Sequence, residues 1–176
     1  MNQSTCEAMK TEDPQQRLDR WLTKHRGLLL KVVLSFTRNG SDQDDLLQEI
    51  AIALWKSMPG FRGESGESTW VYKVALFTAT TWSRGEDRRR ERVAMESRGT
   101  LEHESRCAGD PRQEWMLETI RGLPVVDRTL VLSSLEGYSH AEIAELTGLS
   151  TTNVGVRLHR LKKQLAKLAT EHFDDV

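Results

Sequence analysis

Residues 138–168 constrain the fold more than any other segment, because they specify the start, the end and the connection of two successive helices. Ser139 and Glu142 have the spacing of a capping box, which opens a short helix. Gly148 stands where a helix commonly ends in a left-handed residue, and Ser150 can cap a second helix. The second helix has one apolar face, made by Val154, Leu158, Leu161, Leu165 and Leu168. A short helix, a glycine-containing turn and a longer helix predict a helix-turn-helix.

The opposite face of this second helix carries residue types that bind DNA. At 100° per residue, the side chains that face away from the leucines are Thr152, Val156, His159, Arg160, Lys163 and Lys167. Small or polar residues come first, where a recognition helix meets base edges, and cations come later, where phosphates line the groove. Residues 151–170 contain no acid. The pattern favours DNA binding over its alternative, a solvated basic face on an ordinary helical hairpin.

The net charge of the chain conceals this basic helix. The 176 residues carry 25 Lys+Arg and 26 Asp+Glu, a net charge of −1. Taken alone, that value argues against a protein that holds nucleic acid through bulk positive charge. The charges are sorted, however, because a second basic patch is formed by Arg84, Arg88, Arg89, Arg90 and Arg92. The near-zero total therefore conceals two basic patches.

Helical spacing of apolar residues recurs along the rest of the chain, whereas strand alternation is almost absent. A first helix is predicted after the N-cap Asp13 and stops at Asn39-Gly40. A second is predicted to begin with Ser41 as its cap, and a third to span residues 69–84.

Residues 92–112 break this periodicity. They are polar, contain Gly99, Gly109 and Pro111, and show no sustained period, which is typical of a flexible linker. We therefore expect an all-α fold of two small helical domains, residues 13–91 and residues 113–170. The second of them is the helix-turn-helix.

Composition also disfavours several classes of protein. No apolar run approaches the ~18–20 residues of a membrane span, and the polar first residues lack a signal-peptide core, so we expect a cytoplasmic protein. Cys6 and Cys107 are far apart and are interpreted as reduced thiols. Since no nucleophile–base pair, glycine-rich phosphate loop or ligand cluster is found, we expect neither an enzyme nor a metal or other cofactor.

Two segments carry a family resemblance. The first covers residues 123–165 and reads LPVVDRTLVLSSLEGYSHAEIAELTGLSTTNVGVRLHRLKKQL. It resembles the promoter-binding domain of extracytoplasmic function (ECF) sigma factors. The second covers residues 42–74 and reads DQDDLLQEIAIALWKSMPGFRGESGESTWVYKV. It resembles the domain of the same family that binds core RNA polymerase and melts promoter DNA.

The resemblance implies a short sigma factor that binds core RNA polymerase and directs it to promoter DNA. The implied polymerase partners are the β′ clamp helices and the β flap. Family members are often held inactive by an anti-sigma factor, which is frequently membrane-anchored, so such a partner is implied as well.

The exposed face and the resemblance together place contacts to the −35 element on the second helix of the helix-turn-helix. The residues predicted for them are Thr152, Asn153, Gly155, Val156, His159, Arg160 and Lys163. Relatives usually carry a Lys or Arg and then a Ser at the positions of Gly155 and Val156. The promoter sequence therefore does not follow from analogy.

The resemblance gives recognition and melting of the −10 element to the first domain. Separated bases are held by stacking faces together with cations for the backbone. The residues predicted for this task are Phe61, Arg62, Trp70, Tyr72 and Lys73. Phe61 is the favoured base contact, in a loop over residues 61–68 that can form a pocket for an extruded base, whereas Trp70 is also consistent with a core residue. At Leu76-Phe77 the chain departs from the polar pair that is common in relatives.

Binding to core polymerase is predicted for Asp45, Gln48 and Glu49, which lie within one turn of the second helix. By resemblance their partner is the β′ clamp helices. Two other interpretations stay open here. One is a merely solvated acidic turn, and the other is a divalent metal site made by Asp42, Asp44, Asp45 and Glu49.

Two other functions also stay open at the level of sequence. A helix-turn-helix of this kind resembles the output domain of LuxR-type regulators, so a stand-alone transcription regulator with a helical dimerisation domain is one alternative. A helical interaction protein that only titrates a partner is the other.

Overall fold

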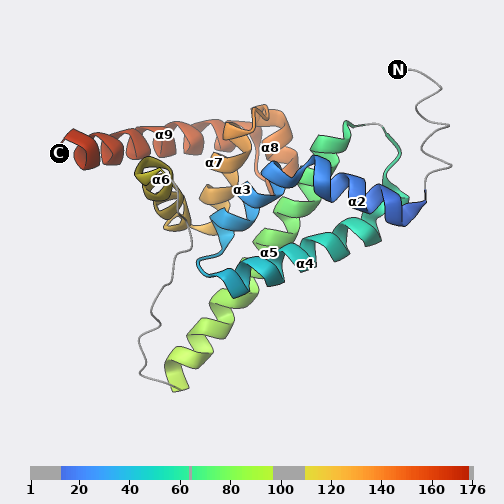
Figure 1. Cartoon of the computed structure of the whole chain (residues 1–176). Coiled ribbons are helices and arrows are strands. Elements are labelled where there is room, and N and C mark those ends of the chain that lie inside the picture. The colour runs from blue at the N-terminus through green and yellow to red at the C-terminus, as the bar shows by residue number, and fades with distance from the viewer. Residues whose placement is uncertain (1–12, 64, 97–109, 175–176) are drawn as a thin grey trace. The chain divides into compact units, whose positions relative to one another are not determined.

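The computed structural model describes residues 13–63, 65–96 and 110–174, with the backbone only for residues 87–96 and 174. These residues form eight α-helices and one 3-10 turn, and no strand occurs among them (Figure 1). The helices belong to two compact units that divide between residues 106 and 107. The expected all-α fold is confirmed. Cys6 and Cys107 lie outside the described residues.

Unit 1 is built from four helices: α2 (Pro14–Lys24), α3 (Arg26–Phe36), α4 (Gly40–Ser57) and α5 (Glu67–Glu96). A 3-10 turn at Met58–Gly60 follows α4. Both α3 and α4 pack along α5, and α2 packs on α4. The largest fully buried side chains of the unit are Trp21, Leu29, Leu46, Ile50, Leu54, Tyr72 and Leu76.

The first predicted helix is in fact two helices. The chain leaves the helical conformation at His25, where φ is −104° and ψ is 16°. Trp21 on α2 and Leu29 on α3 are both buried, so the break lets two short helices turn their apolar sides into one core. The imidazole of His25 is itself 8% exposed. Burial, together with the charge of Lys24, lowers the pKa of His25.

The cap of α4 is Asn39 and not the predicted Ser41. The Asn39 side chain accepts a hydrogen bond from the backbone N–H of Asp42 at 2.8 Å and donates one to the Asp42 carboxylate at 3.1 Å. Asparagine caps a helix as well as serine does, and here it starts the helix at Gly40. Ser41 is exposed within the first turn. Across the described part of the chain, no three His, Cys, Asp or Glu side chains gather closely enough to hold a metal ion.

Helix α5 is longer at both ends than the predicted 69–84. It begins at Glu67 and runs through the arginine cluster to Glu96. Residues 86–96 contain neither glycine nor proline, so nothing in the sequence stops the helix there. Residues 92–96, which were expected to belong to the linker, thus continue α5, and the next helix begins at Pro111. The rest of the predicted linker, residues 97–109, lies outside the described residues.

Unit 2 consists of α6 (Pro111–Arg121), α7 (Val125–Leu135), α8 (His140–Thr147) and α9 (Thr151–Asp174). Helices α7, α8 and α9 pack on one another around Leu130, Ile143 and Leu158, which are at most 2% exposed. The buried guanidinium of Arg128 donates hydrogen bonds to the carbonyls of Arg121 and Leu123 and so holds the end of α6 against α7. None of the described helices has the length and apolar character needed to cross a bilayer.

Candidate nucleic-acid interface

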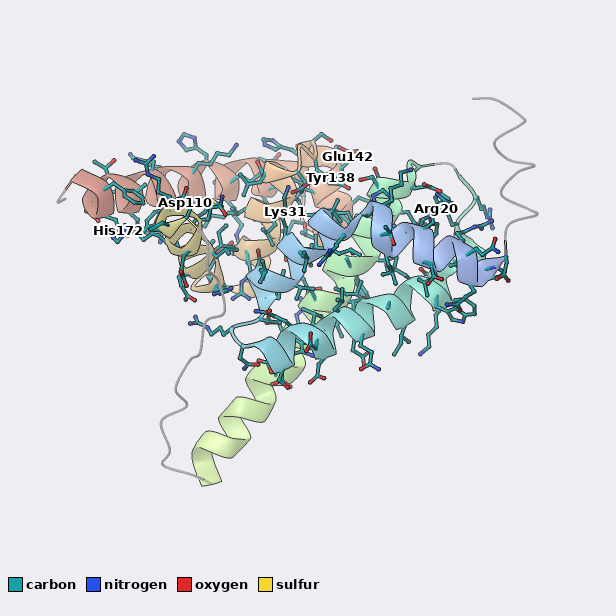
Figure 2. The ribbon with its side chains drawn as sticks, viewed as in Figure 1. Arg20, Lys31, Asp110, Tyr138, Glu142 and His172 are labelled. Atoms are coloured by element: carbon teal, nitrogen blue, oxygen red, sulfur yellow. The ribbon has the colours of Figure 1, made fainter. Side chains whose placement is uncertain are left out.

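The turn between α8 and α9 has the geometry that its sequence predicts. The Ser139 backbone N–H donates to the Glu142 carboxylate at 2.8 Å, and the Glu142 N–H donates to the Ser139 hydroxyl at 3.3 Å, which completes the capping box. Glu142 is labelled in Figure 2. Gly148 ends α8 with φ 72° and ψ 12°. The Asn153 backbone N–H donates to the Ser150 hydroxyl at 3.3 Å. These local bonds fix where α8 ends and α9 begins.

Helix α9 is held by one face and exposes the other. Val154, Leu158 and Leu161 are at most 6% exposed and anchor its first half in the core of unit 2. Most of the predicted −35 residues are exposed to solvent: Thr152, Asn153, Val156, His159, Arg160 and Lys163. Arg157 points elsewhere, because its guanidinium pairs with Asp127 of α7 at 3.1 Å. The structure therefore presents one short row of polar, apolar and cationic side chains.

Gly155 differs from the other predicted −35 residues in its surroundings. A Cβ atom at this position would lie 3.4 Å from Nδ1 of His140, the first residue of α8. A side chain at residue 155 would therefore come into contact with the imidazole of His140. At residue 155, α9 faces a neighbouring side chain as well as solvent.

The predicted −10 residues of unit 1 do not form one exposed surface. Phe61 is 8% exposed, and the centroid of its ring lies 5.4 Å from the ring centroid of Trp21 and 5.4 Å from that of Trp70. Tyr72 is 1% exposed. Both rings pack in the core of unit 1 in this structure, so stacking of either ring on separated bases stays a prediction. Arg62 is exposed, and Lys73 and Trp70 are half-buried.

Helix α4 exposes all three residues predicted to bind core polymerase. Asp45, Gln48 and Glu49 are exposed on the side away from the buried Leu46, Ile50 and Leu54. Two neighbours on this side, Ile52 at 38% and Trp55 at 44% exposure, are not among the residues predicted from the sequence. A signal for them existed, since neither falls on the core-facing stripe of α4. An exposed aromatic beside charged residues is typical of a protein–protein interface.

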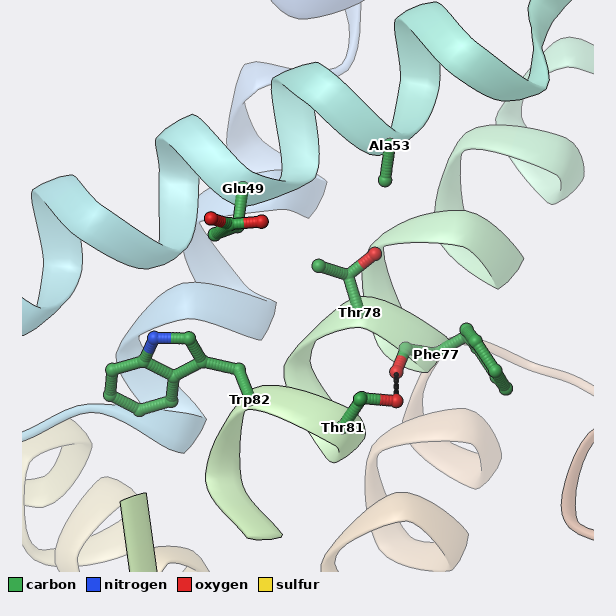
Figure 3. Close-up of a pocket in the computed structure, with 6 residues that line it drawn as sticks. All are labelled: Glu49, Ala53, Phe77, Thr78, Thr81 and Trp82. Atoms are coloured by element: carbon green, nitrogen blue, oxygen red, sulfur yellow. Dashed lines mark hydrogen bonds between the residues drawn. The ribbon is translucent and has the colours of Figure 1, made fainter. Parts of the chain in front are cut away.

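A hollow of about 290 Å³ lies between α4 and α5. Its lining residues are Glu49, Ala53, Phe77, Thr78, Thr81 and Trp82 (Figure 3). The Thr81 hydroxyl donates a hydrogen bond to the backbone carbonyl of Phe77 at 2.9 Å. Phe77 itself is 73% exposed.

Comparison with known proteins identifies the family. The chain matches the family model described as Sigma-70 region 2 over residues 21–89, and the one described as Sigma-70, region 4 over residues 113–165. Together the two ranges cover more than half of the chain. The ECF RNA polymerase sigma-E factor of Haemophilus influenzae is 29% identical over 161 residues, which cover 84% of this chain and 82% of that protein. ECF RNA polymerase sigma factor SigX of Bacillus subtilis is 26% identical over 167 residues, with the same coverage. The chain belongs to the ECF sigma factors of the sigma-70 family.

Two solved structures have the fold of this sigma factor. CnrH, in complex with the cytosolic domain of CnrY, matches with a TM-score of 0.62 at 20% identity over 94% of each chain. The sigma factor RpoE from Bartonella quintana, in complex with the anti-sigma factor NepR, matches with a TM-score of 0.64 at 17% identity. That match covers 84% of this chain and 95% of the RpoE chain.

The family matches contain both of these surfaces of the sigma factor. The region 4 match contains α7, α8 and the part of α9 that carries the row of exposed residues. The region 2 match contains α3, α4 and most of α5. The protein functions in transcription initiation, in which a sigma factor joins RNA polymerase to a promoter.

Proposed function

We propose that this sigma factor binds core RNA polymerase through α4, contacts the −35 element with α9 and opens the −10 region with unit 1. One observation carries the proposal: over residues 151–170, α9 presents an exposed face without acidic residues at the end of a fully capped helix-turn-helix. The protein acts as a specificity subunit of the polymerase and not as an enzyme.

The exposed face of α9 divides into two parts with different tasks. Thr152, Asn153 and Val156 lie in the first two turns, where a recognition helix meets base edges. The 47% exposed side chain of Val156 suits an apolar contact with a thymine methyl group. Arg160 and Lys163 follow one and two turns later and suit phosphate oxygens. We therefore expect base discrimination near residue 156 and general affinity from the two cations.

The exposed side of α4 suits a basic protein partner. Ile52 and Trp55 supply apolar contact area, and Asp45 and Glu49 place two carboxylates beside them. Buried aromatic anchors carry much of the binding energy in interfaces, and the charged rim selects a partner of opposite sign. The β′ clamp helices are the proposed partner of this side, and the β flap is the proposed partner of unit 2.

The proposal includes an anti-sigma factor. The solved relatives CnrH and RpoE are each bound to another protein, CnrY and the anti-sigma factor NepR respectively. A protein that covered Trp55 and the α4 carboxylates would exclude core polymerase from the same surface. An inhibitor acting in this way needs no change in the fold of either unit.

Reconstitution with purified core polymerase tests the function. The chain is expected to co-elute with core in gel filtration and to support transcription from a promoter found by mapping transcripts after overexpression. The double variant R160A K163A should weaken promoter use and leave core binding intact. K162A, which removes another lysine of α9, is the matched control.

W55A should weaken core binding at least ~30-fold, as the loss of a hot-spot aromatic does. L30A is its control, because Leu30 is an exposed apolar residue on α3.

Two outcomes would contradict the proposal. A chain that binds a palindromic site as a dimer without core polymerase would instead be a stand-alone regulator. If the double variant R160A K163A left promoter binding and transcription unchanged, the protein would instead act by titrating a partner.

A further inference from the structure

Gly155 is an unusual residue for its position in α9. It is the fifth of the 24 residues of this helix and lies beyond its first turn. Glycine weakens a helix interior relative to alanine, because it loses more backbone freedom on folding. The backbone does not require glycine here, since the φ angle of Gly155 is not positive. The physical reason for a glycine at residue 155 therefore lies in what surrounds it.

The neighbour of Gly155 is the imidazole of His140, the first residue of α8. A Cβ atom on residue 155 would lie 3.4 Å from Nδ1 and 3.6 Å from Cε1 of this ring. A side chain that extended beyond Cβ would compete with the ring for the same space. The missing side chain thus leaves a gap on the surface of α9, and one edge of the His140 ring lies against that gap.

The gap belongs to the exposed row of side chains on α9. Thr152 comes three residues before Gly155 and His159 four residues after it, so these positions share one side of the helix. Thr152, His159 and His140 are all exposed to solvent. Within the part of the chain that the structure describes, the His140 side chain has no hydrogen-bond or ion-pair partner. His140 therefore adds one unpaired polar group from α8 to a row that otherwise comes from α9.

An imidazole at this place is suited to a phosphate oxygen. In a helix-turn-helix the first helix crosses the DNA backbone, while the second enters the major groove. Helix α8 is the first helix of this motif, so its side chains meet the wall of the groove and not the base edges. A ring N–H is a hydrogen-bond donor, and phosphate oxygens accept most of the hydrogen bonds that proteins make to DNA.

We infer that His140 donates a hydrogen bond to a backbone phosphate of the −35 element, and that Gly155 is a positioning residue whose missing side chain lets the ring reach this place. The inference rests on the proposed function. It adds a residue of α8 to the predicted contacts of α9. It also gives Gly155 a role that acts through His140 and not through DNA directly.

The test uses holoenzyme reconstituted from the full chain and core polymerase, on a labelled duplex of the promoter identified by transcript mapping. H140A is expected to weaken promoter binding about 3- to 10-fold, as the loss of one hydrogen bond does. H140F keeps an aromatic ring at the gap without an N–H and should be equally weak, whereas H140R supplies donors and should restore binding. The loss should be the same for every −35 sequence, because a phosphate contact carries no sequence information.

The positioning role of Gly155 is tested by G155L. Leucine is a better helix former than glycine, so the melting temperature should not fall, but its side chain takes the space of the His140 ring and should weaken promoter binding. The double variant H140A G155L should bind no more weakly than the weaker single variant, because both changes remove the same contact. G27L is the matched control, since Gly27 is an exposed glycine of α3 with no atom within 4 Å of an added Cβ.

A methylphosphonate scan locates the contact. When phosphates of the −35 element are replaced one at a time by uncharged methylphosphonate, one replacement should weaken binding by the wild type and leave binding by H140A unchanged. Wild-type affinity in H140F would overturn the inference, as would an H140A loss that adds in full to every replacement. A wild-type holoenzyme that initiates at no promoter would instead refute the proposed function itself, so the two failures are distinguishable.

Discussion

A single carboxylate, that of Glu67, ties α5 to α2. It accepts hydrogen bonds from Arg20 at 2.9 Å, from the Trp21 indole at 3.2 Å and from Lys24 at 3.0 Å (Figure 2 labels Arg20). Burial raises the pKa of Glu67. The hydrogen bonds from Lys24, Arg20 and Trp21 lower it by more than burial raises it, so the pKa falls to about 2. Glu67 is also the first residue of α5, where a negative charge is favoured.

We expect E67Q to lower the free energy of unfolding of unit 1 by about 1–2 kcal/mol at pH 7, because three donors lose a charged acceptor that is partly screened by solvent. The folded-state pKa lies below the ordinary value of 4.5, so this stabilisation is present above pH 4.5 and is lost as the pH falls toward 2. Urea unfolding followed by tryptophan fluorescence, at pH 7 and pH 3, measures the difference.

The control for this prediction is E171Q. Glu171 forms an exposed pair with Lys167 at 3.5 Å, and its loss should change stability by no more than about 0.5 kcal/mol. An E67Q penalty of equal size at both pH values would contradict the electrostatic origin.

At the scale of elements, the glycine between α8 and α9 sets how the recognition helix leaves the core. Gly148 has φ 72°, a conformation that L-residues adopt at a cost, and its N–H donates to the Ala144 carbonyl at 2.9 Å. An added Cβ would meet no atom within 4 Å, so the strain of a substitution there is purely conformational.

G148A is therefore expected to lower the free energy of unfolding of unit 2 by about 1–2 kcal/mol. G122A is the control, because Gly122 caps α6 with φ −71°, which alanine adopts without strain. Thermal unfolding by circular dichroism measures both. Equal melting temperatures for G148A and the wild type would show that the turn tolerates a different backbone.

Most helix positions and types followed from periodicity and capping residues, but the break at His25 and the end of α5 did not. The break at His25 has no proline, and Gly27 comes two residues later, so the local sequence reads as one helix. The helix breaks at His25 only because Trp21 and Leu29 must enter the same core. The predicted end of α5 lies before the observed end at Glu96, because a charged, polar stretch is compatible both with an exposed helix and with a linker.

At the scale of the whole molecule, positive and negative charges nearly balance, but they are not evenly distributed. The exposed face of α9 carries Arg160, Lys163 and Lys167, and the chain as a whole has a net charge of −1. With few cations on the proposed DNA-binding face, the near-neutral remainder of the chain adds no general attraction to DNA. We therefore expect tight promoter binding to require core polymerase.

The isolated chain is expected to bind a −35 duplex weakly, with a slope of log affinity against log salt of roughly −2.7 for about three phosphate contacts. This slope corresponds to a loss of roughly 40-fold between 50 and 200 mM salt. Fluorescence anisotropy with a labelled duplex measures it. Affinity as tight as that of the holoenzyme at 150 mM salt would contradict the expectation.

The sequence by itself determined the all-α fold, the helix-turn-helix and its exposed face, because capping boxes, a left-handed glycine and a leucine stripe act within a few residues of one another. Only the tertiary structure decided which aromatics are available to a ligand. Phe61 and Tyr72 belong to the same residue class as Phe77, and their sequence neighbourhoods do not separate them from it. Burial depends on which helices pack over a side chain, and these contacts join residues far apart in the sequence.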